Sequence, residues 1–144
     1  MSRPVLLVLV CLSLFLVLFP LAVGKPGLPT HLKADEAAYY LMSLSLARDH
    51  DLRCETKDLH RLYDEFPVDV RNLILSSPDG WKTVYFAKPY VYSLLAMPFA
   101  ALFGANGMVA FNMALLLLAV ALATVYLSRF NPGWLAALYA GGFF

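Results

Sequence analysis

Two adjacent acids, Asp35 and Glu36, stand near the start of the stretch HLKADEAAYYLMSLSLARDHDL, which covers residues 31–52. A positioned carboxylate can take a proton from a hydroxyl as a general base, which typically contributes about 10²–10⁴-fold to a reaction rate. The same acids also suit the start of a helix, since Asp35 fits the N-cap and Glu36 falls in a first turn favoured by the helix dipole. Residue type alone leaves both interpretations open.

A lysine, Lys88, lies at the boundary between a polar segment and an uncharged one. A cation in that position can meet a phosphate head group and stabilise the charge that develops on a leaving phosphate. The alternative is that the long side chain of Lys88 only reaches from a helix end toward water.

The elements that must position these residues belong to a membrane protein. Mean hydropathy is +0.67 and only 15% of the 144 residues are charged. All ten acids, all three histidines and nine of the eleven lysines and arginines lie between Lys25 and Lys88. The net charge of +1 gives no reason to expect a nucleic-acid partner. Cys11 and Cys54 lie in different segments and predict neither a disulfide nor a metal site.

Apolar segments flank this polar insert. Residues 1–24 predict a first transmembrane helix, although AVG before Lys25 also resembles the cleavage site of a signal peptide. Residues 108–128 predict a second spanning helix. Residues 89–104 are shorter and contain Pro98, so they predict an interfacial or short membrane helix.

A further apolar segment, residues 134–144, is too short to cross a membrane. We therefore expect an all-α, multi-pass protein of the cell membrane, of which this chain is the N-terminal fragment. Arg3 places the N-terminus inside by the positive-inside rule, which makes residues 25–88 an extracytoplasmic loop. Arg129 lies inside as well if residues 89–104 do not cross.

The loop itself predicts an amphipathic helix near its start. Ala37, Leu41, Leu44 and Ala47 follow helical spacing. Further along, four residues could line an acceptor or metal site, although grouped charges on a solvated loop are the simpler interpretation: His60, Tyr63, Asp64 and Glu65. Three aromatic residues are candidate anchors at the membrane interface: Trp81, Tyr85 and Tyr90.

The order of these elements resembles the N-terminal part of the GT-C glycosyltransferases, which use polyprenyl-phosphate sugars. The resemblance rests on DExxYYLMxxSLARDxDL after a first membrane segment, on KPxxYxLLxxPFxxLFG, and on an uncharged helix that begins after NG and ends near an arginine. It covers about Val5 to Tyr126. The class includes the protein mannosyltransferases that use dolichyl-phosphate mannose and the bacterial aminoarabinose lipid A transferases. Its members have many more spanning helices, and the fragment alone is expected to be inactive.

The resemblance implies catalytic roles for Asp35 and Glu36 and a contact between Lys88 and the donor phosphate. Tyr39 and Tyr85 are further candidates for substrate binding. The partners implied are membrane lipid, a polyprenyl-phosphate sugar donor and a glycan, lipid or protein acceptor at the outer membrane face. The lipid-linked donor is a substrate; no certain cofactor and no metal-ligating residue is implied, and a divalent metal stays open. The chain has Ala87 where the aminoarabinose transferases have an acid, which leaves the substrate subclass open.

The second hypothesis is a non-enzymatic polytopic membrane protein, or an accessory subunit, whose external loop binds a partner. A transporter would more often carry ionisable residues inside its spanning segments, and these segments have none. That distribution favours chemistry at the outer surface.

Overall fold

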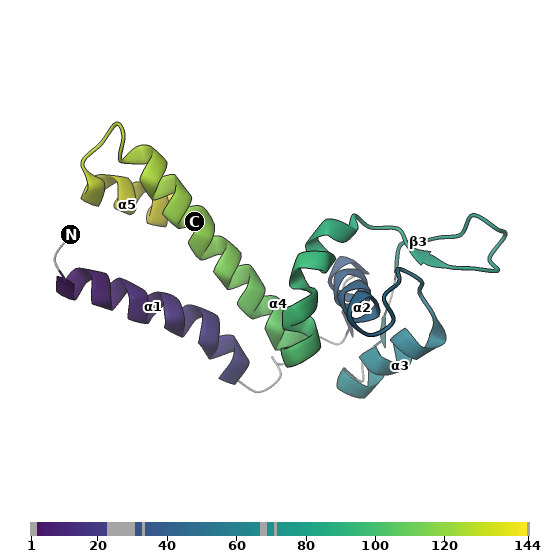
Figure 1. The fold of residues 1–144 in the computed structure, drawn as a ribbon. Helices are drawn as coiled ribbons and strands as arrows, with labels where there is room; N and C mark the ends of the chain where they lie inside the picture. The colour runs from purple at the N-terminus through teal and green to yellow at the C-terminus, as the bar shows by residue number, and fades with distance from the viewer. Residues whose placement is uncertain (1–2, 23–30, 33, 67–68, 71, 144) are drawn as a thin grey trace. The chain divides into compact units, whose positions relative to one another are not determined.

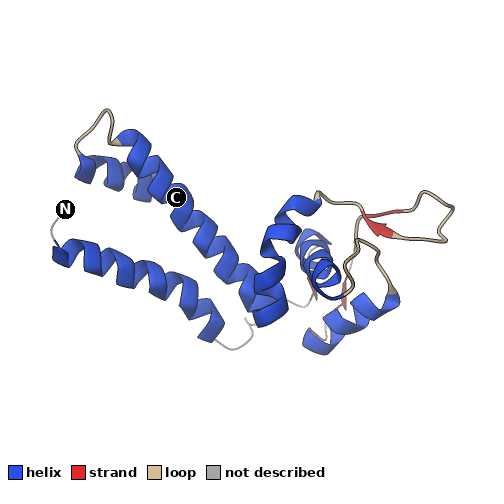
Figure 2. Ribbon diagram, viewed as in Figure 1, coloured by secondary structure: helices blue, strands red, loops and turns tan. Residues whose placement is uncertain are grey.

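The computed structural model describes residues 3–22, 31–32, 34–66, 69–70 and 72–143. Most of these residues are helical, as Figure 2 shows, which agrees with the predicted α-helical class. The chain forms two compact units, which are described separately. One unit comprises residues 23–108, and the other comprises residues 1–22 together with residues 109–144.

The second of these units is apolar. It contains α1 (Arg3–Ala22), the later part of α4 (Tyr90–Leu127) and α5 (Gly133–Phe143), all labelled in Figure 1. Among the described residues, α4 is the one helix long and apolar enough to cross a membrane, with a mean hydropathy of 2.4 in its most apolar window. Within α1, the apolar segment Ser13–Ala22 is shorter. Several membrane crossings therefore stay a prediction.

The unit of residues 23–108 holds α2 (Ala34–Arg48), α3 (Thr56–Glu65), the first part of α4 and four strands of two residues each. The strands form two pairs: β1 (His31–Leu32) runs parallel to β2 (Asp69–Val70), and β3 (Leu75–Ser76) runs antiparallel to β4 (Tyr85–Phe86). An all-α prediction misses them, because two residues are too few to show the alternating pattern of a strand.

Hydrogen bonds within the loop between β3 and β4 hold its shape. The carboxylate of Asp79 accepts hydrogen bonds from the backbone N–H of Thr83 (2.8 Å) and from its hydroxyl (2.7 Å). These bonds lower the pKa of Asp79 from its ordinary value. The side chain of Trp81 in this loop is exposed.

Over residues 37–45 of α2 every side chain is buried except that of Tyr39, which is half-buried, so this stretch lacks the exposed polar face that an amphipathic helix would have. Its apolar side chains form the core of the unit together with Leu62, Phe66, Phe86 and Ala100. The helix also buries two polar side chains, whose hydroxyls are satisfied locally. Ser43 donates to the backbone carbonyl of Tyr39 (2.8 Å), and Ser45 donates to the Asp51 carboxylate (3.0 Å). Serines in α2 therefore face protein, not water.

Gly104 breaks α4 into two helical parts, residues 90–103 and residues 105–127. Its backbone has φ +60° and ψ −143°, which is not helical and which glycine adopts readily. The chain turns so sharply that a Cβ on Gly107 would lie 2.0 Å from the carbonyl oxygen of Phe99. The break falls where the sequence GANG predicts a boundary.

The side chain of Glu65, the last residue of α3, joins this break to α2. Its Oε1 accepts a hydrogen bond from the backbone N–H of Ala105 (3.1 Å), the first residue after the break. Its Oε2 accepts from the hydroxyl of Tyr40 in α2. Burial raises the pKa of Tyr40, and the hydrogen bond to Glu65 raises it further, so the hydroxyl stays protonated and donates. A carboxylate at a helix start is also favoured by the dipole of the second part of α4.

The first part of α4 buries small residues and exposes large apolar ones. Ser93, Ala96 and Ala100 are buried against the unit. The opposite side carries exposed apolar residues: Val91, Leu94, Leu95, Leu102 and Phe103. A helix on a water-exposed surface would show the reverse pattern.

We expect Gly104→Ala to destabilise the protein. A Cβ at this position would lie 2.5 Å from Oε1 of Glu65, and the positive φ would add backbone strain, so roughly 1–3 kcal/mol of unfolding free energy should be lost. Gly80→Ala is the matched control, because Gly80 has φ +69° but open space around it. Thermal unfolding of both variants in detergent measures the difference. Equal losses would show that Glu65 does not pack against Gly104.

Candidate functional site

The structure brings together two of the residues that the sequence singles out for chemistry. Lys88 Nζ lies 2.6 Å from Oδ1 of Asp35, within the unit of residues 23–108. Asp35 lies in the first turn of α2, and Lys88 lies two residues before the start of α4. The side chain of Asp35 is 62% exposed and that of Lys88 is 18% exposed. The carboxylate is therefore open to a ligand, while the lysine is held against the protein.

Asp35 is not the N-cap that the sequence predicts. The structure begins α2 at Ala34, which places both Asp35 and Glu36 inside the first turn. Both acids still lie at the positive end of the helix dipole. Their side chains leave the helix about 100° apart, so they point to different places. Lys88 contacts the carboxylate of Asp35, which distinguishes Asp35 from Glu36. Glu36 is also exposed.

Tyr39 helps to position the pair. Its backbone carbonyl accepts a hydrogen bond from the hydroxyl of Ser93 in α4 (3.1 Å). Its ring packs edge-on against the ring of Tyr92, with centroids 5.2 Å apart. These contacts hold α2 against α4 about one helical turn beyond Asp35. They therefore set the distance between Asp35 and Lys88. Tyr39 is half-buried, and a role in substrate binding stays a prediction for it.

Tyr85, the other tyrosine proposed to bind substrate, lies apart from Asp35 and Lys88. It lies in β4, its side chain is half-buried, and its backbone pairs with Ser76 and bridges to Arg53. None of the contacts described for Tyr85 reaches Asp35 or Lys88. A role in substrate binding therefore stays a prediction for Tyr85.

A second polar region lies where the end of α2 meets α3. Arg61 of α3 binds both carboxylate oxygens of Asp49, at 2.5 Å and 3.0 Å, and also binds the buried carboxylate of Asp58 at 3.1 Å. Asp58 further accepts a hydrogen bond from the backbone N–H of Glu55 (2.9 Å) at the start of α3. Lys57 completes the cluster at 3.4 Å from Asp49. Sequence spacing gives no sign of this cluster, because Asp49 lies in the turn beyond α2.

The pKa values of the two acids in the cluster are shifted in opposite directions. Hydrogen bonds from Arg61 lower the pKa of Asp49 to about 2. Burial raises the pKa of Asp58 above its ordinary value, against the opposing effects of the Glu55 N–H and Arg61. Burial likewise raises the pKa of the Cys54 thiol to about 11, so this cysteine is uncharged and a weak nucleophile at neutral pH.

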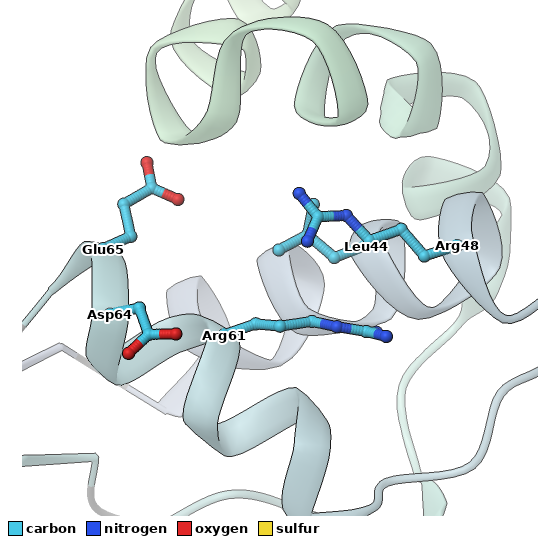
Figure 3. A pocket seen from close by; sticks show the side chains of 5 residues that line it. All are labelled: Leu44, Arg48, Arg61, Asp64 and Glu65. Carbon is cyan, nitrogen blue, oxygen red and sulfur yellow. The ribbon is translucent and has the colours of Figure 1, made fainter.

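Next to this cluster is a hollow of about 320 Å³ that opens to solvent. Leu44 and Arg48 of α2 line it, together with Arg61, Asp64 and Glu65 of α3 (Figure 3). Two of the four residues proposed from the sequence for an acceptor or metal site, Asp64 and Glu65, are therefore at a hollow. The other two, His60 and Tyr63, do not line it.

The described residues contain no group of three or more histidine, cysteine, aspartate or glutamate side chains arranged to hold a metal ion. Comparisons of the chain with protein-family models, with curated proteins and with solved structures gave no match. A proposal about function therefore rests on the geometry of the sites.

The lowered pKa of Asp49 predicts a pH-dependent contribution to stability. A carboxyl whose pKa is about 2 when folded and about 3.9 when unfolded stabilises the fold above pH ~4 and loses that contribution as the pH falls toward 2. We expect Asp49→Asn to be less stable than the wild type at pH 6, with the gap closing between pH ~4 and ~2. Thermal unfolding of both proteins across this range measures the gap. A gap that is constant with pH would contradict the ion pair with Arg61.

Proposed function

We propose that this chain belongs to a membrane glycosyltransferase, which transfers a sugar from a polyprenyl-phosphate donor to an acceptor at the outer membrane face. The observation that carries the proposal is the 2.6 Å contact between Asp35 and Lys88. Two distant parts of the sequence, each selected for a different half of one reaction, supply the two groups. The transfer needs a base for the acceptor hydroxyl and a cation for the leaving phosphate.

The contact suggests an order of events. In the absence of donor, Lys88 is paired with Asp35. When the donor binds, its phosphate takes the place of the carboxylate as the partner of Lys88, and Asp35 becomes available as a base. The acceptor oxygen then attacks the anomeric carbon of the sugar and loses its proton to Asp35. The bond between that carbon and the phosphate oxygen breaks, and the electron pair stays with the phosphate beside Lys88.

The surroundings of Lys88 support a lipid-linked donor. The lysine directly precedes a run of forty uncharged residues, 89–128. The first part of α4 exposes large apolar side chains along one side, including Val91 and Leu95. Hydrocarbon or the membrane interface is the environment that suits such a surface. We propose that residues 89–104 lie at the interface, that the protein is multi-pass, and that residues 25–88 face outside.

The test of this function is Asp35→Asn in protein expressed from the complete gene. The variant removes the base but keeps the size and shape of the side chain, and the rest of α2 is unchanged, so α2 should still form. We expect transfer to fall on the order of 10²-fold or more, as for the loss of a general base. Transfer of radiolabelled sugar from a polyprenyl-phosphate donor in isolated membranes measures the rate.

Glu36→Gln is the matched control, because Glu36 lies in the same turn. It should reduce transfer much less than Asp35→Asn. A reversed ranking would exchange the roles of the two acids. Normal transfer by both variants would mean that the acids only start a helix, and would favour the non-enzymatic hypothesis of a partner-binding loop.

A further inference from the structure

The polar groups that line the hollow at the end of α2 differ in the partners that they have among the described residues. Arg61 is occupied by Asp49 and Asp58, and Glu65 accepts hydrogen bonds from Tyr40 and Ala105. Arg48 and Asp64 are different. No hydrogen bond or ion pair joins either side chain to another described residue, although the charge of Arg48 acts on Tyr40.

These two side chains offer opposite hydrogen-bonding capacities. The guanidinium of Arg48 has five N–H donors in a plane, and the carboxylate of Asp64 has only acceptors. Figure 3 shows the guanidinium of Arg48 and the carboxylate of Glu65 directed into the same space from α2 and α3. Leu44 also lines the hollow, but it is almost fully buried and offers a ligand little apolar surface.

The mixture of charges restricts what can bind. An anion would approach two carboxylates, those of Asp64 and Glu65, and a cation would approach the guanidinium groups of Arg48 and Arg61. A neutral hydroxyl avoids repulsion by either charge, because it can accept a hydrogen bond from an arginine and donate one to a carboxylate. Neighbouring hydroxyls on a sugar ring can do both at once. The volume of about 320 Å³ is at the lower end for small-ligand sites.

We propose that this hollow binds a neutral carbohydrate, with Arg48 as donor and Asp64 as acceptor. Arg48 lies 13 residues after Asp35 on the same helix, about 20 Å along its axis. A sugar in the hollow is therefore too far away to react at Asp35. If the proposed transferase function holds, the hollow takes a remote part of an extended glycan acceptor, whose reacting end reaches Asp35.

The experiment measures binding without transfer. Neutral manno- and malto-oligosaccharides, acidic oligogalacturonides and cationic chitosan oligosaccharides are titrated into the full chain in detergent, by calorimetry. Neutral oligosaccharides should bind, and the charged ones should bind more weakly. Arg48→Gln and Asp64→Asn should each weaken the binding about tenfold or more, because each removes hydrogen bonds made by a charged group. Arg53→Gln is the matched control, since Arg53 is an exposed arginine outside the hollow and should have no effect.

Three results would overturn the proposal: no binding of any neutral oligosaccharide, preferential binding of the acidic or cationic ones, or equal losses in Arg48→Gln and Arg53→Gln. Circular dichroism of each variant checks that it folds. Failure of the transferase function is recognised separately. In that case the wild type binds neutral oligosaccharides through Arg48 and Asp64 but transfers no sugar, and the hollow is a binding site in its own right.

Discussion

One carboxylate holds the polar unit together. Glu65, at the end of α3, accepts hydrogen bonds from the hydroxyl of Tyr40 in α2 and from the backbone N–H of Ala105 in α4. Three helices meet at this side chain. Gly104 makes the arrangement possible, because its positive φ breaks α4 and its missing Cβ leaves room for the carboxylate. Changing one partner would take one donor from a partly buried carboxylate, which is costly.

The positions of Asp35 and Lys88 follow from this constraint. Glu65 fixes α2 against α4 at the break, and the hydrogen bond from Ser93 to the Tyr39 carbonyl fixes the same two helices nearer their starts. The beginning of α2 therefore lies beside the beginning of α4, and Lys88 can reach Asp35. Asp35 lies on α2 and Lys88 lies two residues before α4, so two helices packed against each other position the groups to which we assign the chemistry. Such support is what a precise reaction geometry requires.

The sequence predicts some of this arrangement and not the rest. Local signals are strong enough to predict a helix after Asp35 and a break at Gly104, and a change from charged to uncharged residues marks Lys88. The burial of almost every side chain over residues 37–45 of α2 is not predictable from its periodicity, because Ser43 and Ser45 satisfy their hydroxyls inside the protein. The cap assigned to Asp35 is also wrong, since the structure begins α2 one residue earlier, at Ala34.

Long-range contacts are the other part that the sequence does not provide. Glu65 resembles its charged neighbours in the sequence, and only the fold gives it Tyr40 and Ala105 as partners. The same holds for the ion pairs of Arg61 with Asp49 and Asp58, and for the two short strand pairs. A resemblance in motif order suggested that Asp35 and Lys88 serve one reaction, and the contact between them is a separate, geometric reason to consider them together.

The most direct test of the central claim is the affinity of a polyprenyl phosphate without sugar for purified protein in detergent. If Lys88 exchanges Asp35 for the phosphate, Lys88→Gln weakens binding, while Lys82→Gln, a matched change at an exposed lysine, does not. Asp35→Asn then tightens binding by up to about fivefold, because it removes a competing partner worth about 1 kcal/mol or less. Unchanged affinity in Lys88→Gln, or weaker binding in Asp35→Asn, would contradict the account.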